Sequence, residues 1–225
     1  MVSASLLTAS RQNRDNGDSR SEKAYRRLKE KIVRLELPPA SLLNEIQLMH
    51  ELKLGRTPIR EALQRLAFEN LVVILPRRGT IVADLNLSDL QKTFEVRLEL
   101  EAQAVRLATQ RATAAQIARM EALFAGADEL IHSGDHHQLI FLDQEAHRLL
   151  AEATHNEFLA EMLERLYTQM LRLWYVSLHK VSRLSEAIEE HRDIIAAVKA
   201  GDADRAAEIM RVHVAGFHEE FTAVL

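Results

Sequence analysis

The chain has 225 residues, of which 47% are hydrophobic and 28% are charged, so it can form one large or two small globular domains. It contains no cysteine, which excludes a disulfide framework and a thiolate metal site. No apolar run approaches the roughly 18 residues of a membrane span, and the N-terminus lacks a secretion signal. We therefore expect a cytoplasmic protein that does not enter the membrane.

The charge is divided unevenly along the chain. Residues 1–84 carry 15 Lys+Arg against 10 Asp+Glu, a net charge of +5, whereas residues 85–225 carry 14 against 23, a net charge of −9. A basic front on an acidic body favours a polyanion-binding module joined to a second domain of different function.

Residues 1–20 are predicted to be a disordered arm, and residues 21–85 a DNA-binding domain. A first helix is expected at about 21–35 with Ser21 as its N-cap, and Leu37-Pro38-Pro39 ends it because proline disfavours helix before it. A second short helix is expected at about 44–52, with Asn44 as its N-cap.

A third helix begins at Thr57, which can cap it, and Pro58, which suits the first helical position. The apolar run LVVIL, the turn PRRG and the run TIVADL then predict a β-hairpin with a basic tip. Three short helices and a hairpin make a winged helix-turn-helix.

Residues 86–225 are predicted to be all-helical, with six helices in an antiparallel bundle. Capping boxes are expected at Ser88 and Thr113, each three residues before a glutamine. Gly134 and Gly201 read as helix ends. The six helices are expected at about 87–111, 113–133, 136–154, 157–180, 183–200 and 202–224.

The third helix carries the residues best suited to DNA. Arg56 and Arg60 lie at its N-terminus, off its apolar face, where side chains of this kind can meet phosphates and base edges in a major groove. Most arginine clusters are only a solvated surface, so the prediction depends on the motif, the wing and the charge asymmetry together.

The stretch RTPIREALQRL at residues 56–66, followed by RRG at 77–79, resembles the GntR superfamily of bacterial transcription regulators. The resemblance covers about residues 22–85, although Gly55 stands where the family usually has serine. It implies that the N-terminus of the third helix contacts DNA and that the wing tip reaches the minor groove. The predicted DNA contacts are Arg56, Thr57, Arg60, Arg65, Arg77, Arg78 and Gly79.

Three histidines and one aspartate of the second domain fall on or beside apolar helix faces. Asp143 and His147 are four residues apart and share a face, while His191 and His213 lie within apolar stripes of two later helices. Such groups are costly to bury alone, and a divalent ion would satisfy all four. This donor set suits Zn²⁺ first, with Ni²⁺, Mn²⁺ or Fe²⁺ as alternatives. A lone inward histidine is more often a hydrogen-bonded core residue.

The segments FLDQEAHRLLAEATHNEFL and EEHRDIIAAVKAGD, with the late M-x-x-H, resemble the FCD effector domain of FadR-type GntR regulators over about residues 87–222. The resemblance implies that Asp143, His147, His191 and His213 are metal ligands, and that a small carboxylate effector binds beside the metal. Arg97 and Glu101 match its R-x-x-x-E. Arg97 either clamps the effector carboxylate or merely pairs with Glu101.

The sequence therefore favours a DNA-binding transcription regulator, a repressor, rather than an enzyme. We expect a homodimer that recognises a palindromic double-stranded operator and responds to a small organic acid. Two alternatives stay open. One is a sensor of the metal ion itself. The other is a helical metalloenzyme with a nucleic-acid-binding tether, against which the chain lacks the paired Glu-x-x-His motifs of di-metal bundles.

Overall fold

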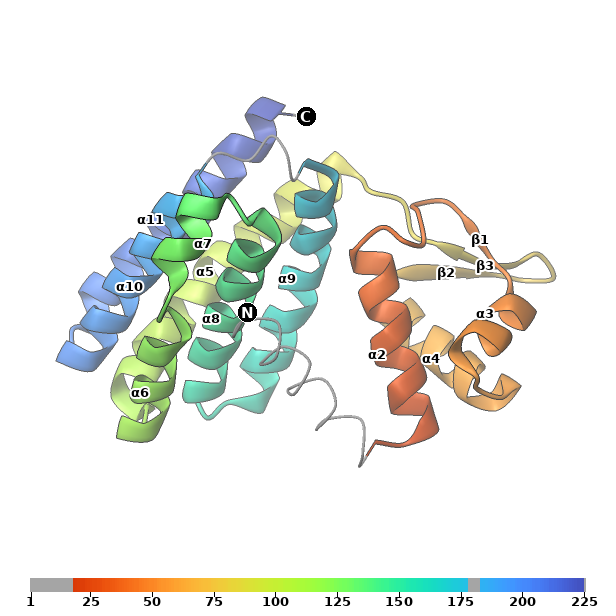
Figure 1. The fold of residues 1–225 in the computed structure, drawn as a ribbon, viewed down its shortest axis with the longest axis horizontal. Helices are drawn as coiled ribbons and strands as arrows, with labels where there is room; N and C mark the ends of the chain where they lie inside the picture. Colours follow the sequence, from red (N-terminus) through yellow and green to blue (C-terminus); the bar gives the residue numbers. More distant parts are fainter. Residues whose placement is uncertain (1–17, 178–182, 225) are drawn as a thin grey trace. The chain divides into compact units, whose positions relative to one another are not determined.

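The computed structural model describes residues 18–177 and 183–224, in two compact units that divide between Leu85 and Asn86 (Figure 1). Most of the predicted N-terminal arm lies outside the described residues. Within them, no helix is long and apolar enough to cross a membrane.

The first unit is a winged helix-turn-helix, as predicted. Its strands form an antiparallel sheet in the order β1-β3-β2, with Leu42 opposite Ile81 and Ile74 opposite Thr80. The sequence did not predict β1, because a strand of two residues has no periodicity to detect. The elements are α2 (Arg20–Val33), β1 (Leu42–Leu43), α3 (Glu45–Leu52), α4 (Arg56–Phe68), β2 (Val72–Leu75) and β3 (Gly79–Val82).

Two predicted N-caps in this unit are wrong. The hydroxyl of Ser19, and not that of Ser21, accepts the Glu22 N–H at the start of α2. At α4 the N-cap is Gly55, whose extended backbone makes no side-chain cap, so Thr57 lies inside the helix with its side chain exposed. The predicted cap Asn44 is confirmed at α3, where its side chain accepts hydrogen bonds from two backbone N–H groups.

Helix α2 packs on α4, and apolar residues of all three helices and the sheet close a single core. This core holds the N-terminal half of α4 at the surface in a fixed orientation. Its fully buried members include Leu28, Ile32, Ile59, Leu66, Leu71 and Val82.

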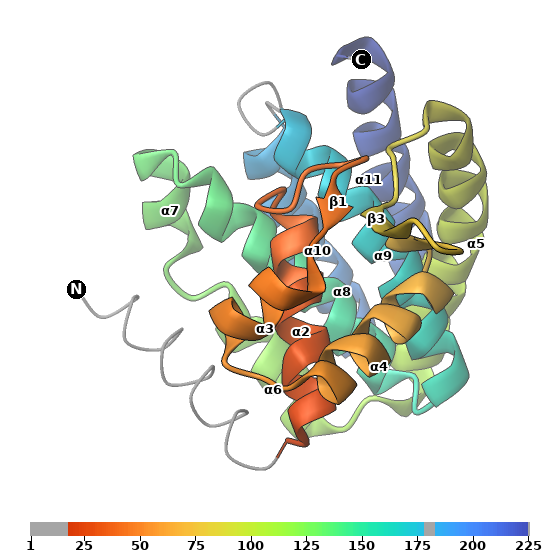
Figure 2. The same ribbon diagram turned by 90° about the vertical axis from the view of Figure 1, so that its right-hand side faces the viewer.

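The second unit is all-helical among its described residues. Helix α5 packs against α11, α8 and α9, and α10 lies beside α11 and α8 (Figures 1 and 2). The elements are α5 (Leu87–Arg111), α6 (Ala114–Leu123), α7 (Ala127–Ser133), α8 (His136–Ala153), α9 (Glu157–Ser177), α10 (Leu184–Ala200) and α11 (Ala203–Val224).

The mainly helical fold class is as predicted, but the predicted helix at 113–133 is divided in two. The chain breaks between α6 and α7 at Gly126, which adopts a left-handed φ of 84°. The capping box of Thr113 is confirmed, as are the left-handed ends at Gly134 and Gly201. Ser88 is not a cap, because the side chain of Asn86 fills that position. The last residues of the helix predicted at 157–180 lie outside the described residues.

Candidate functional site

The N-terminal half of α4 presents the side chains of Arg56, Thr57 and Arg60 to solvent. Arg60 is oriented by α3, because its Nε lies 2.9 Å from Oε2 of Glu45. An arginine held through Nε keeps its two terminal amino groups for another acceptor, such as a guanine edge or a phosphate.

Arg65, further along α4, is engaged within its own unit. Its guanidinium lies 2.6 Å from Glu22, stacks 3.6 Å over the ring of Tyr25 and is within 3.7 Å of Glu69. The contacts tie α4 to α2. They give Arg65 a structural role that the motif alone did not indicate.

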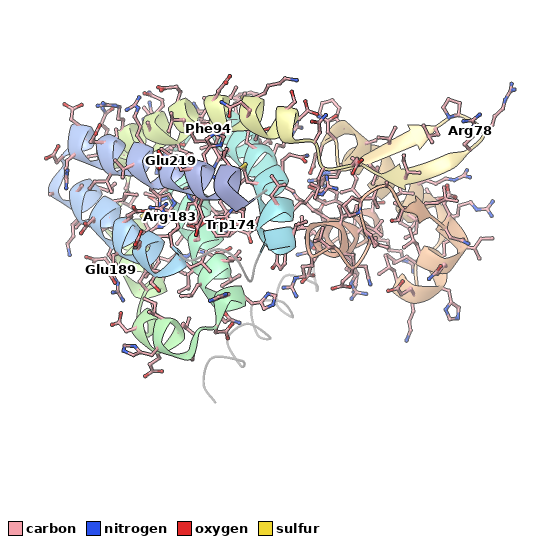
Figure 3. All side chains as sticks on the ribbon, turned by 90° about the horizontal axis from the view of Figure 1, so that it is seen from above. Arg78, Phe94, Trp174, Arg183, Glu189 and Glu219 are labelled. Carbon is pink, nitrogen blue, oxygen red and sulfur yellow. The ribbon has the colours of Figure 1, made fainter. Side chains whose placement is uncertain are left out.

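The hairpin tip carries the other predicted DNA contacts. Arg77, Arg78 and Gly79 are all exposed; Arg77 and Arg78 lie between β2 and β3, and Gly79 is the first residue of β3. Arg77 and Gly79 have left-handed φ angles of 62° and 100°, which close the turn. Arg78 projects from the end of the hairpin (Figure 3), as a residue that enters a groove must do.

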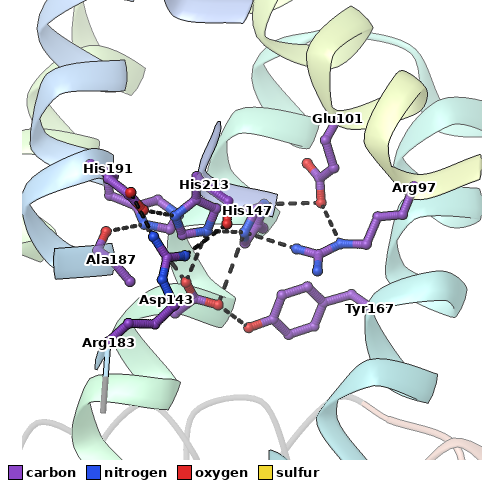
Figure 4. Close-up of polar contacts among 10 residues, drawn as sticks. Arg97, Glu101, Asp143, His147, Tyr167, Arg183, Ala187, His191 and His213 are labelled. Carbon is purple, nitrogen blue, oxygen red and sulfur yellow. Dashed lines mark hydrogen bonds and ion pairs between the residues drawn. The ribbon is translucent and has the colours of Figure 1, made fainter. Parts of the chain in front are cut away.

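The second unit brings together the four residues predicted as metal ligands. One donor atom from each of Asp143, His147, His191 and His213 lies within 4.8 Å of the others, and all four side chains are buried (Figure 4). They come from three helices, α8, α10 and α11, that pack against each other. The apolar faces of α8 and α11 each pack against α10, and the four side chains are buried together where these faces meet.

Each histidine of this cluster faces an acceptor through Nδ1. His191 Nδ1 lies 2.8 Å from the carbonyl of Ala187, His213 Nδ1 lies 2.8 Å from Glu190, and His147 Nδ1 lies 2.9 Å from Glu101. A proton on Nδ1 of His191 and of His213 bonds to these acceptors and leaves the Nε2 lone pair free. The Nδ1 of His147 makes no hydrogen bond to Glu101 despite the short distance.

The Nε2 atoms of His147 and His213 converge with the aspartate, and His191 approaches it with Nδ1 3.7 Å from Asp143 Oδ1. His147 Nε2 is 3.2 Å from His213 Nε2, which lies 3.3 Å from Asp143 Oδ1. Among the described residues, Asp143 Oδ1 and His191 Nε2 have no hydrogen-bond partner although both are buried. Buried polar atoms without a partner are costly, and a divalent ion coordinated by three imidazoles and a carboxylate would pair both. The donor set therefore fits the predicted ion.

Electrostatics within the cluster favour the deprotonated form of Asp143, His147 and His191, and the protonated form of His213. Burial lowers the pKa of His191 well below its usual value, and it also lowers the pKa of His147. Burial opposes the ionised form of Asp143, but the His213 imidazole, 3.3 Å from Oδ1, and the imidazoles of His147 and His191 hold the pKa of that carboxyl far below its usual range. For His213, Asp143 and Glu190 outweigh burial and raise the pKa.

Arg97 and Glu101 line the same cluster, each about 1% exposed. They form the predicted pair, with Arg97 Nε 3.2 Å from Glu101 Oε1. The Nη2 of Arg97 also lies 3.0 Å from His147 Nε2, and its guanidinium lies 4.8 Å from the ring centre of Tyr167.

Sequence reasoning missed three residues around the cluster. The hydroxyl of Tyr167 donates to Asp143, Glu190 contacts His213, and Arg183 contacts Glu190. Glu190 precedes His191 directly, which was a usable signal. Tyr167 and Arg183 join the cluster only through the packing of helices distant in sequence.

Known proteins share the two-domain organisation of this chain. Residues 20–82 match the model of the bacterial regulatory proteins of the gntR family, and residues 92–216 match the FCD domain. The transcriptional repressor GlaR of Escherichia coli is 30% identical over 84% of this chain and 90% of its own length. The regulator YdhC of Bacillus subtilis is 27% identical over 84% of this chain and 85% of its own length.

A solved structure of McbR from Escherichia coli has a TM-score of 0.82 to this chain. The superposition covers 92% of this chain and 98% of the McbR chain at 24% sequence identity, so the two proteins share a fold. The relatives are transcription regulators and not enzymes. The chain belongs to the gntR family of bacterial regulatory proteins, whose members bind DNA, and carries an FCD domain behind its helix-turn-helix domain.

Proposed function

We propose that this transcription regulator is a dimeric repressor that a small carboxylate effector controls from a divalent metal site in the FCD domain. The observation that carries the proposal is the convergence of Asp143, His147, His191 and His213 within 4.8 Å, with the guanidinium of Arg97 against one of them. Repression, rather than activation, is supported by the relative GlaR, which is named a transcriptional repressor.

Arg56, Thr57 and Arg60 supply the major-groove contacts in this proposal, and Arg78 and Gly79 reach the adjacent minor groove. One short helix reads only a few base pairs, so a two-fold dimer with recognition helices about 34 Å apart explains how the protein selects a palindromic operator. Arg65 then acts indirectly, by fixing α4 on α2 through Glu22.

Asp143 Oδ1 and the Nε2 atoms of His147, His191 and His213 hold the ion in this proposal. A divalent ion with these ligands supplies a Lewis-acidic centre that an effector carboxylate can join. Three nitrogen donors and one oxygen donor suit Zn²⁺, with Ni²⁺, Mn²⁺ and Fe²⁺ as the other candidates.

Arg97 connects the proposed metal site with the proposed effector site. Its Nη2 faces the Nε2 lone pair of His147 at 3.0 Å, which is the lone pair that a metal ligand uses. Once His147 is a ligand, that N–H of Arg97 is released to another acceptor inside a buried site. A carboxylate matches the guanidinium fork in charge and geometry, so we assign Arg97 to the effector and Glu101 to holding Arg97 Nε.

The DNA contact is tested by replacing Arg60 with alanine. Operator binding is expected to weaken about 10- to 100-fold because a good bidentate base contact discriminates by roughly 1–3 kcal/mol. Arg119→Ala, which removes an exposed arginine of α6, is the matched control. Fluorescence anisotropy with operator and scrambled duplexes measures both. An operator affinity equal to that of the control variant would overturn the assignment of α4.

A second candidate is a sensor of the metal ion alone. It is favoured by the four protein ligands, which complete a tetrahedral shell without an organic molecule. Operator binding should be titrated with Zn²⁺ and with chelator, in the presence and absence of small organic acids. Release of DNA by an acid only when Zn²⁺ is bound supports the effector model. Release or binding governed by Zn²⁺ alone supports the sensor.

A further inference from the structure

The metal ligand His213 is held from outside the cluster by a closed set of contacts. Its Nδ1 lies 2.8 Å from Oε2 of Glu190, and Oε1 of the same carboxylate lies 2.8 Å from Nη2 of Arg183. The other terminal amino group of Arg183 donates to the backbone carbonyl of His213 at 2.9 Å. One guanidinium therefore fixes both the side-chain partner and the backbone of this histidine.

Arg183 is placed for this role by the fold. It is the N-cap residue of α10, and its guanidinium crosses to α11, where it lies 4.7 Å from the ring centre of Phe217. Its side chain is 12% exposed and that of Glu190 is 19% exposed, so water screens the pair only weakly. Figure 4 shows Arg183 beside His213 and Asp143.

Gly216, on α11, makes room for the guanidinium. A Cβ built at this position would overlap Cζ and both terminal nitrogens of Arg183. A glycine inside a helix is unfavourable relative to alanine, so its presence here has a steric reason. Any side chain at position 216 must displace Arg183.

We propose that Glu190 and Arg183 are positioning residues for the metal ligand His213. Gly216 has no side chain, and this leaves the room that Arg183 needs to reach Glu190 and the backbone of His213. Glu190 accepts the Nδ1 proton of His213, which fixes the ring orientation and turns the Nε2 lone pair towards Asp143. Arg183 holds the carboxylate of Glu190 in place and neutralises its charge. The inference rests on the proposed metal site.

The arrangement repeats a pattern on the opposite side of the cluster. There Glu101 faces His147 Nδ1 and pairs with Arg97. Arg97, however, also faces Nε2 of His147 and is free to exchange partners, whereas the contacts of Arg183 all lie outside the ligand sphere. The Arg183–Glu190 pair therefore tunes ion affinity without touching the effector.

The test measures Zn²⁺ affinity of the full chain by competition with a chromogenic chelator. Glu190→Gln and Gly216→Ala are expected to weaken binding 10- to 100-fold, the usual cost of removing an outer hydrogen-bond partner of a ligand. Glu186→Gln, an exposed carboxylate on the same helix, is the matched control and should bind like the unmodified chain. The absorption spectrum of bound Co²⁺ should change in Glu190→Gln and Gly216→Ala and stay unchanged in the control.

Gly216→Ala separates positioning from folding. The higher helix propensity of alanine offsets part of the loss of the Arg183 contacts, so the metal-free variant should stay folded, with a melting temperature close to that of the unmodified chain, while its Zn²⁺ affinity falls. In an Arg183→Ala background, Gly216→Ala should cause no further loss, because the displaced group is already absent. Unmodified Zn²⁺ affinity in both Glu190→Gln and Gly216→Ala would overturn the inference. Failure of the unmodified chain to bind Zn²⁺, Ni²⁺, Mn²⁺ or Fe²⁺ would instead overturn the proposed metal site.

Discussion

Metal binding should stabilise the FCD domain measurably, and the structure sets the scale. Two buried polar atoms, Asp143 Oδ1 and His191 Nε2, have no hydrogen-bond partner among the described residues. Each such atom costs about 1–3 kcal/mol, so coordination relieves about 2–6 kcal/mol. The observed stabilisation depends on the ion concentration, and free Zn²⁺ at about 100 times its Kd stabilises a protein by about 2.7 kcal/mol.

For a domain of the size of residues 86–225, about 2.7 kcal/mol corresponds to a rise in Tm of roughly 10 °C. Scanning calorimetry of the full chain, after chelator treatment and again with added Zn²⁺, measures the shift for the transition of this domain. The transition of the DNA-binding domain serves as an internal reference, because it has no ligand in the cluster.

The decisive comparison is the metal-induced shift in His191→Ala, which removes one ligand. The shift should shrink to a few degrees or disappear, whatever the starting Tm of this variant. His132→Ala removes an exposed histidine of α7 and should keep the full shift. An equal shift in His191→Ala and His132→Ala, or none in the unmodified chain with any of the four candidate ions, would refute the reasoning.

Three further outcomes are expected. Burial raises the pKa of Tyr25 to about 12, so the stability that its protonated hydroxyl contributes is complete below pH 10 and is lost as pH rises towards 12. Tyr25→Phe should therefore remove about 2–3 kcal/mol of the loss in unfolding free energy between pH 10 and pH 12, measured by unfolding as a function of pH. Arg78→Ala should weaken operator binding and lower the salt slope by about one, measured by anisotropy against salt. Arg97→Lys should keep Zn²⁺ affinity within a few-fold but weaken the response of operator binding to organic acids at least 10-fold, because lysine lacks the fork.

The sequence predicted that the four residues of the cluster face inward because burial leaves a periodic signature. His191 and His213 interrupt apolar stripes, and Asp143 and His147 share one helix face, so each could be placed inward before any contact was known. The caps at Asn44 and Thr113 were predictable for a similar reason, since their partners are two or three residues away.

The features that the sequence did not predict depend on contacts between distant residues. Arg183 meets the backbone of His213 thirty positions later, and Tyr167 reaches Asp143 from another helix. Thr57 was misplaced because Gly55 and Thr57 are both acceptable caps, and their residue types alone do not separate them. Arg65 matches a DNA-binding motif, yet its surroundings on α2 determine what it contacts.

The charges joined to the cluster support the proposal that the effector is an anion. Contacts connect three carboxylates, those of Glu101, Asp143 and Glu190, with two guanidiniums, those of Arg97 and Arg183. With neutral imidazoles this set has a net charge of −1, and a divalent ion brings it to +1. An isolated charge is costly in a buried site, and one carboxylate cancels it. A neutral effector would leave the charge uncompensated, and a cation would add to it, so charge balance selects the same ligand class as the guanidinium fork of Arg97.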